Sequence, residues 1–203
     1  MSLATSTLKS DLLTLFNTMA SNTSGDNSVF SEGVAAALKD FIESAAVTTT
    51  DAGTVSGGAF VGTGTGTISA DSSECEATIL AACEAMVKMT SGGNSYLAQQ
   101  IAEGMQEMSD AAEVSCDVTG TLTTTAGATS TLTGTSTGTI ACSYDLAGDL
   151  EAVFKAMVDM TSGGDEYMAE GMAAAAEAFV LSGVVSTDGE GSLAGSTGAG
   201  AAA

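Results

Sequence analysis

The sequence that decides the fold is MVKMTSGG, from Met86 to Gly93, because it returns as MVDMTSGG from Met157 to Gly164 with one difference. Repetition at a fixed spacing indicates a repeat architecture and takes precedence over any single motif. The N-terminal segment aligns with the third copy without a gap, which places Leu8 on Leu146 and Phe41 on Phe179. The chain is therefore predicted to contain three copies of one unit of roughly 70 residues.

Each copy opens with two amphipathic helices. In the first helix of the first copy the apolar residues recur at helical spacing, which predicts a buried stripe. The second helix keeps one spacing of apolar residues in all three copies, so its buried face is what the fold requires. The first-helix stripe is Leu8, Leu12, Leu15, Phe16 and Met19; the second-helix stripes are Phe30, Val34, Leu38 and Phe41, then Leu97, Ile101, Met105 and Met108, then Met168, Met172, Ala176 and Phe179.

A Ser-Gly-Gly turn is predicted to separate the two helices of each copy. Glycine adopts the left-handed conformation that ends a helix, and Asn or Asp then caps the start of the next helix. A phosphate-binding glycine loop would need a preceding strand and a lysine, and neither is present. The signature residues are Ser24, Gly25 and Asn27, then Ser91, Gly92 and Asn94, then Ser162, Gly163 and Asp165.

After each helix pair the sequence changes to threonine, valine and glycine, which favour strands and turns. Residues 47–68 and 114–140 are each predicted to form a β-hairpin, with turns at Gly57-Gly58 and Ala126-Gly127. The third copy is predicted to be truncated, since it supplies one weak strand before an Ala/Gly tail that should be disordered on its own. The predicted fold class is α+β, with repeats at 1–71, 72–143 and 144–190 and a low-complexity tail at 191–203.

The cysteines give two expectations. Cys116 and Cys142 flank the second hairpin, so they should face each other across antiparallel strands, either as a disulfide or as two small apolar residues. We favour the disulfide, which an extracellular location would permit. Cys83 replaces a phenylalanine of the helix stripe and should be a buried free thiol. The cysteine spacing does not match a zinc site, and there is no histidine.

Charge excludes several classes of partner. The 203 residues carry a formal net charge of -21 with only four basic residues, all lysines. A nucleic-acid-binding face needs several Lys or Arg side chains together, and an anionic membrane surface needs the same. The acidity is interpreted as a solvated outer surface. No Asp-x-Asp-x-Asp-Gly loop indicates calcium, so no metal or cofactor is predicted.

Composition also argues against catalysis. Without His or Arg, the commonest general base and the commonest anion clamp are missing. Carboxylate pairs remain, namely Glu103 with Glu107 and Asp165 with Glu166, but they fall on predicted exposed helix turns where nothing would desolvate one partner. The chain is predicted not to be an enzyme.

One family resemblance adds to this picture. The unit LKSDLLTLFNTM at 8–19, followed by SVFSEGVAAALKDFIESAAVTTT at 28–50 and GTGTGTI at 62–68, resembles small acidic Gly/Thr-rich proteins encoded among virion structural genes of tailed bacteriophages. The resemblance implies a non-enzymatic assembly role in capsid decoration, neck or tail, with other virion proteins or further copies of itself as partners. It transfers no site residues.

The first functional hypothesis is therefore a virion structural protein that docks through its β-hairpins or Gly/Thr edges and is part of an oligomeric assembly. The start MSLATSTLKSD has no secretory signal pattern, so we expect assembly in a host cytoplasm. The alternative is a cell-surface or extracellular filament protein, whose strands would polymerise edge to edge. A third hypothesis is an acidic module that binds a cationic protein or metal ion.

Overall fold

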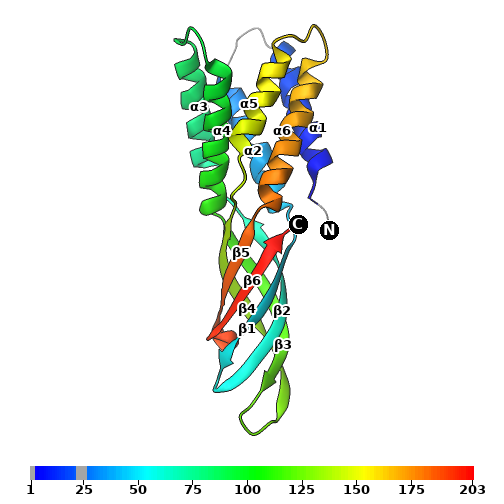
Figure 1. Ribbon diagram of the computed structural model, residues 1–203, viewed down its shortest axis with the longest axis vertical. Helices are drawn as coiled ribbons and strands as arrows, with labels where there is room; N and C mark the ends of the chain where they lie inside the picture. Colours follow the sequence, from blue (N-terminus) through cyan, green and yellow to red (C-terminus); the bar gives the residue numbers. More distant parts are fainter. Residues whose placement is uncertain (1–2, 22–26) are drawn as a thin grey trace.

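The structure, a computed structural model, describes residues 3–21 and 27–203. In these residues the chain forms six α-helices in pairs, which alternate with three β-hairpins. The helices lie together at one end of an elongated molecule and the strands at the other (Figure 1). The elements are α1 (Thr5–Ser21), α2 (Asn27–Glu43), β1 (Val47–Val55), β2 (Gly58–Ser69), α3 (Ser73–Met86), α4 (Gly93–Asp110), β3 (Glu113–Thr123), β4 (Thr129–Ala141), α5 (Leu146–Met157), α6 (Gly164–Leu181), β5 (Val184–Gly189), the 3-10 helix η1 (Gly191–Leu193) and β6 (Ser196–Ala202). The predicted α+β class, with three helix-pair and hairpin units, is confirmed.

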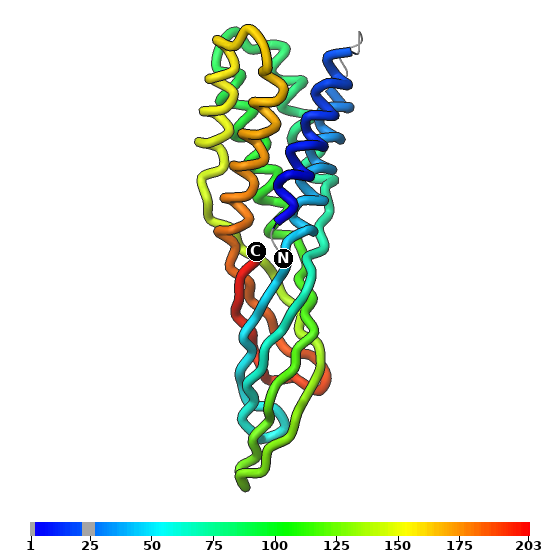
Figure 2. The backbone as a smooth tube through the Cα atoms, turned by 90° about the vertical axis from the view of Figure 1, so that its right-hand side faces the viewer, coloured from blue at the N-terminus to red at the C-terminus, as the bar shows by residue number. Residues whose placement is uncertain are grey.

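The six helices form a closed ring. Each first helix packs between the second helix of its own unit and that of another unit: α1 lies against α2 and α6, α3 against α4 and α2, and α5 against α6 and α4. The helices α2, α4 and α6 carry the wider buried faces. The units therefore surround a common axis in a threefold pseudo-symmetric bundle, which Figure 2 shows from the side.

The predicted apolar stripes form the core of this bundle. Leu8, Leu12 and Phe16 of α1 are buried, as are Leu150 and Phe154 of α5. The first position of each second-helix stripe is only half-buried and the later positions are fully buried. The half-buried residues are Phe30, Leu97 and Met168.

The strands close into one antiparallel barrel in the order β1-β2-β3-β4-β5-β6. Alternate residues point inward, and many of the inward positions are glycines. In β2 the inward run is Gly58, Phe60, Gly62 and Gly64, whereas Ala59, Val61 and Thr63 between them face solvent. A barrel of so few strands has little interior volume, so the inward positions favour residues without a side chain.

The prediction that the third repeat is truncated was wrong. Residues 191–203 include η1 and β6, and β6 pairs with β5 on one side and with β1 on the other, where Val47 opposes Ala202. The low-complexity composition of this segment matches its position, since Ser196, Gly198 and Ala202 fill inward sites that a large side chain would overfill. The tail is ordered because it supplies the last strand of the barrel.

The connections between paired helices differ in detail from the prediction. The first helices end at Met86 and Met157, before the Ser-Gly-Gly turn. Gly92 and Gly163 are left-handed, with φ of 78° and 74°, but each serves as the N-cap of the following helix. Asn94 and Asp165 therefore lie inside the first turn of α4 and α6 and are not caps. Asn94 instead donates from Nδ2 to the carbonyl oxygen of Phe154, at 3.2 Å.

In the first unit, Asn27 is the first residue of α2, and the predicted signature residues Ser24 and Gly25 lie outside the described residues. The hairpin turns are close to their predicted positions. Ser56 and Gly57 have φ of 50° and 80°, which is typical of a two-residue type I′ turn, one residue before the predicted pair. Gly127, with φ of 81°, lies in the predicted second turn.

Candidate functional site

The end of the bundle remote from the barrel is the candidate functional site. The two connections between paired helices that the structure describes lie at this end, where α1 ends and α2 begins as well (Figure 1). Two of them, residues 87–92 and 158–163, are called the tip loops here. Val87 is 79% exposed and Val158 is 71% exposed, and two methionines of the same loops, Met89 and Met160, are also exposed. Large apolar side chains grouped on a surface mark sites of protein contact.

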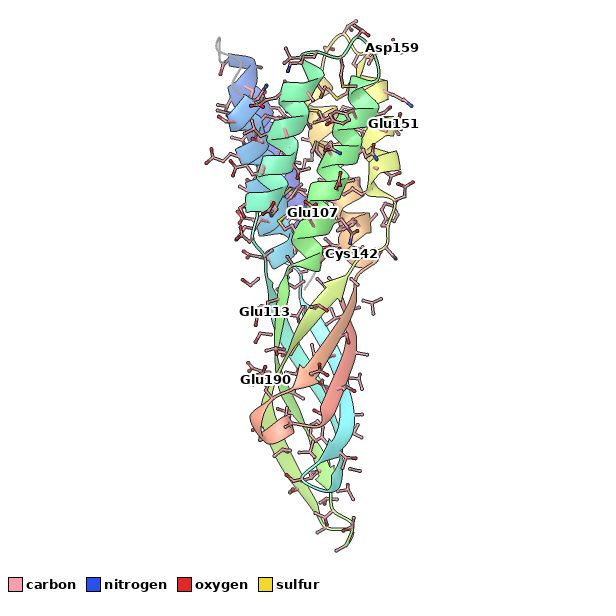
Figure 3. All side chains as sticks on the ribbon, turned by 90° about the vertical axis from the view of Figure 1, so that its left-hand side faces the viewer. Glu107, Glu113, Cys142, Glu151, Asp159 and Glu190 are labelled. Carbon is pink, nitrogen blue, oxygen red and sulfur yellow. The ribbon has the colours of Figure 1, made fainter. Side chains whose placement is uncertain are left out.

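The tip loops have the same sequence except at one position, where the second unit has Lys88 and the third has Asp159. Figure 3 shows Asp159 at the outer end of the bundle. The corresponding residue of the first unit is Ser21, the exposed last residue of α1. Among the described residues Lys88 forms no ion pair, whereas the other three lysines each pair with a glutamate. The one lysine at this surface is thus available to a partner.

A cavity of about 290 Å³ opens at the same end of the bundle. It lies where the three second helices begin, and it includes the half-buried residue of each apolar stripe. Its lining is apolar apart from one amide, and two of its methionines are flexible side chains that can adapt to an inserted group. The lining residues are Phe30, Asn94, Leu97, Phe154, Met157, Val158 and Met168.

The barrel interior holds a second group of polar residues. Asp51 is completely buried and accepts a hydrogen bond from Thr49 Oγ1 at 2.7 Å. Its Oδ1 and Thr187 Oγ1 have no partner among the described residues. Both oxygens crowd the point where a Cβ of Gly198 would stand, at 2.5 and 2.3 Å. Because the barrel encloses these groups, they contribute to its internal packing and face no open cavity.

Sequence reasoning missed this cluster, although the pattern contained a signal for it. Alternation from Val47 places Thr49 and Asp51 on the same inward face of β1.

The outer wall of the barrel has a simpler composition than the interior. Two open depressions lie on this wall, with volumes of about 470 and 490 Å³. They are lined mostly by threonine, glycine and alanine. Neither lining contains a lysine or a buried carboxylate.

The expected disulfide between Cys116 and Cys142 is wrong, because all four cysteines are free. Cys116 lies opposite Ser136 in the strand register, and Cys142 lies past the end of β4, beside Ser109 of α4. The hairpin turn is therefore not midway between the two cysteines. Both thiols are buried, but the two cysteines do not face each other, so the alternative of two small apolar residues opposite one another is wrong as well. Cys83 is a free, half-buried thiol.

Burial affects the ionisation of the thiols. It raises the pKa of Cys75 to about 12, with a smaller contribution from the nearby Glu107 carboxylate, and it raises the pKa of Cys142 to about 11. Figure 3 shows Glu107 and Cys142 in the lower part of the bundle. The thiolate is the reactive form of cysteine, so these two residues should be inert at neutral pH.

We expect iodoacetamide to modify Cys83 at least tenfold faster than Cys75 in the folded chain at pH 8. Cys83 is half-exposed, whereas Cys75 is fully buried and its raised pKa leaves almost no thiolate at that pH. Mass spectrometry of proteolytic peptides over time measures the two rates. In denaturant all four cysteines should react at similar rates. Equal rates in the folded chain would contradict the burial of Cys75.

The carboxylate pairs considered for catalysis are not enclosed. Glu103 is exposed and accepts a hydrogen bond from Gln100 Nε2 at 2.8 Å, and Glu107 is exposed on the same helix. Glu166 is exposed and lies 3.6 Å from Lys9 Nζ, and its neighbour Asp165 is half-buried in the first turn of α6. Glu103 lines an open depression of about 350 Å³ with Tyr144 and Asp145, and its partner Glu107 is not part of that lining.

Two further features were searched in the part of the chain that the structure describes. There, no cluster of three or more Cys, Asp or Glu side chains is arranged to hold a metal ion. None of the helices found in residues 3–21 and 27–203 combines the length and the apolar character needed to cross a membrane.

Comparison with known proteins found no matching family model, no matching curated protein and no matching solved structure. The functional assignment of this chain therefore depends on the geometry of the bundle tip, the pseudo-symmetry and the resemblance of the repeat unit.

Proposed function

We propose that this chain is a non-enzymatic structural component of a virus particle and that it docks end-on through the tip of its helix bundle. The observation that supports this role is the position of its exposed apolar residues. Val87 and Val158 project from the end of an elongated, strongly acidic molecule, next to an apolar cavity. In such an arrangement the bundle tip binds the particle and the barrel projects away from it.

The threefold pseudo-symmetry suits a docking site with local threefold character. A closed ring of three similar units arranges its helix pairs around one axis, so a single chain can make three related contacts with a symmetric neighbour. The barrel then acts as a stiff projection, since its strands are joined by hydrogen bonds around the full circumference. This supports capsid decoration, neck or tail as the place of the protein.

The closed barrel changes the expected mode of docking. The sequence predicts docking through the β-hairpins or through Gly/Thr edges, and the filament alternative requires strands to pair edge to edge. All six described strands have two neighbours, and β6 occupies the edge between β5 and β1. Edge pairing would require the barrel to open. The tip therefore has stronger support as the docking surface, and no observation favours the filament.

The proposal is tested on density-purified particles from the source culture. We expect peptides of this chain to co-purify at a constant ratio to a major capsid protein. Mass spectrometry with labelled standards measures that ratio. A ratio equivalent to hundreds of copies per particle indicates shell decoration, and tens of copies or fewer indicate neck or tail. Absence from intact particles, with the protein in a sheared-cell fraction, would reject the virion role.

The docking surface is tested with two variants in the same particles. Val87→Ser combined with Val158→Ser should lower incorporation at least tenfold, because it removes exposed apolar contacts without touching the core. Val61→Ser is the matched control, since Val61 is 61% exposed on the outer face of β2 and far from the tip. Equal incorporation of both variants would move the docking surface away from the tip.

A further inference from the structure

We infer that the bundle tip is self-complementary and that two copies of this chain bind each other tip to tip. The inference rests on the proposed function, because it names a second copy as an occupant of the proposed docking surface. The observation behind it is the single difference between the tip loops, which places a lysine and an aspartate at equivalent positions of one symmetric surface.

Charge is distributed around the tip in a simple way. The three equivalent positions hold Ser21, Lys88 and Asp159, which are neutral, positive and negative, and all three are exposed. The residue before each is Ala20, Val87 or Val158, so each charged position follows an exposed valine. The two charged loops thus combine the same apolar group with opposite charges.

Symmetry then selects one arrangement of two copies. A tip-to-tip dimer has a twofold axis perpendicular to the long axis of the molecule, and threefold pseudo-symmetry allows three such axes. One axis brings Lys88 against Lys88, and another brings Asp159 against Asp159. The third axis brings Ser21 against Ser21, so that Lys88 of each copy meets Asp159 of the other. For the three positions Ser21, Lys88 and Asp159, only the third arrangement gives two attractive pairs and no repulsive pair.

Apolar contact supplies the remaining stabilisation. Val87 and Met89 of one copy would meet Val158 and Met160 of the other at both loop contacts, and so remove exposed apolar surface from water. The cavity beside Val158 leaves room for a side chain of the second copy. The contact involves only the end of a narrow bundle, so we expect a micromolar dissociation constant, on the order of that found for small transient interfaces.

The overall charge of -21 per chain opposes association at low ionic strength. At physiological salt the Debye length is about 8 Å, so charges far from the tip are screened while pairs within the interface remain effective. The measurement therefore belongs at physiological salt. Sedimentation velocity over a wide range of concentration should show a monomer-dimer equilibrium of the full chain.

Two charge-reversal variants give the decisive test. Lys88→Asp leaves both loops negative, and Asp159→Lys leaves both positive, so neither variant has an attractive pairing with itself. Each should dimerise at least tenfold more weakly than the unaltered chain. A mixture of the two variants should form a one-to-one heterodimer, because every loop pairing between them is attractive. The double variant, Lys88→Asp with Asp159→Lys, should regain dimerisation.

Asp117→Lys is the matched control, since Asp117 is exposed on the barrel and its change in charge equals that of Asp159→Lys. It should dimerise at least as well as the unaltered chain. Circular dichroism should show unchanged folding in all variants. A monomer at every concentration, or a dimer that is indifferent to both tip reversals, would overturn the inference. Either result leaves incorporation into particles as a separate measurement, so the two proposals fail independently.

Discussion

Replacing Gly138 with alanine is expected to destabilise the chain by at least about 3 kcal/mol, the upper part of the range for an overpacked core. A Cβ at this position would stand 1.9 Å from the carbonyl oxygen of Ser186 and 2.7 Å from the Cα of Thr187. Both atoms belong to the backbone of β5, which is hydrogen-bonded to β4 and β6. To relieve this overlap, β5 would have to move relative to both β4 and β6.

Urea unfolding followed by circular dichroism measures this loss as a lower transition midpoint. Thr139→Ala is the matched control, because Thr139 is the next residue of β4 and faces solvent, so its replacement should change the stability by less than about 1 kcal/mol. Similar midpoints for the two variants would mean that β4 and β5 lie farther apart at Gly138 than in this structure.

Inward glycines of this kind explain why the barrel was not predicted as a closed structure. The run GTGTGT was predicted to be part of a β-hairpin, and that part of the prediction is confirmed. The usual signal of a buried face is an apolar side chain, which these glycines lack. The inward face therefore had no hydrophobic signature, and closure depends on contacts between strands far apart in the sequence.

Helices were easier to predict because their buried side chains are large. The spacing of Val34, Leu38 and Phe41, repeated in the other units, identifies one face of a helix without further information. The three units were also correctly recognised from the repeat. Their arrangement around an axis was not predictable, since a linear stack would bury the same stripes.

Local rules failed where two of them competed. A Ser-Gly-Gly sequence followed by Asn or Asp satisfies both a helix C-cap and a helix N-cap, and the structure uses the left-handed Gly92 as the N-cap of α4. The Ser-Gly part of each tip loop was predicted as a turn, but the exposure of the two loops follows only from their common place at one end of the bundle. Lys88 and Asp159 gained significance from that placement.

Removal of residues 195–203 is expected to cause the second large effect, aggregation or a marked loss of thermal stability. The deletion removes β6, which separates β1 from β5, and leaves two strands with unpaired backbone N–H and C=O groups. Open edges pair with edges of other chains, so the shortened protein should aggregate or melt at least about 10 °C lower. Light scattering and thermal unfolding measure the two outcomes.

The control shortens a loop that forms no strand pairing in the barrel. Residues 124–128 connect β3 to β4 and are all exposed, and the pair Thr123 and Thr129 ends the ladder beneath them. Replacing the five-residue loop with Asn-Gly provides a two-residue hairpin turn, so this variant should not aggregate and should keep a nearly unchanged stability. If the chain without β6 behaved like this control, the barrel would not need its last strand, and the Ala/Gly segment would be the dispensable tail that its composition indicates.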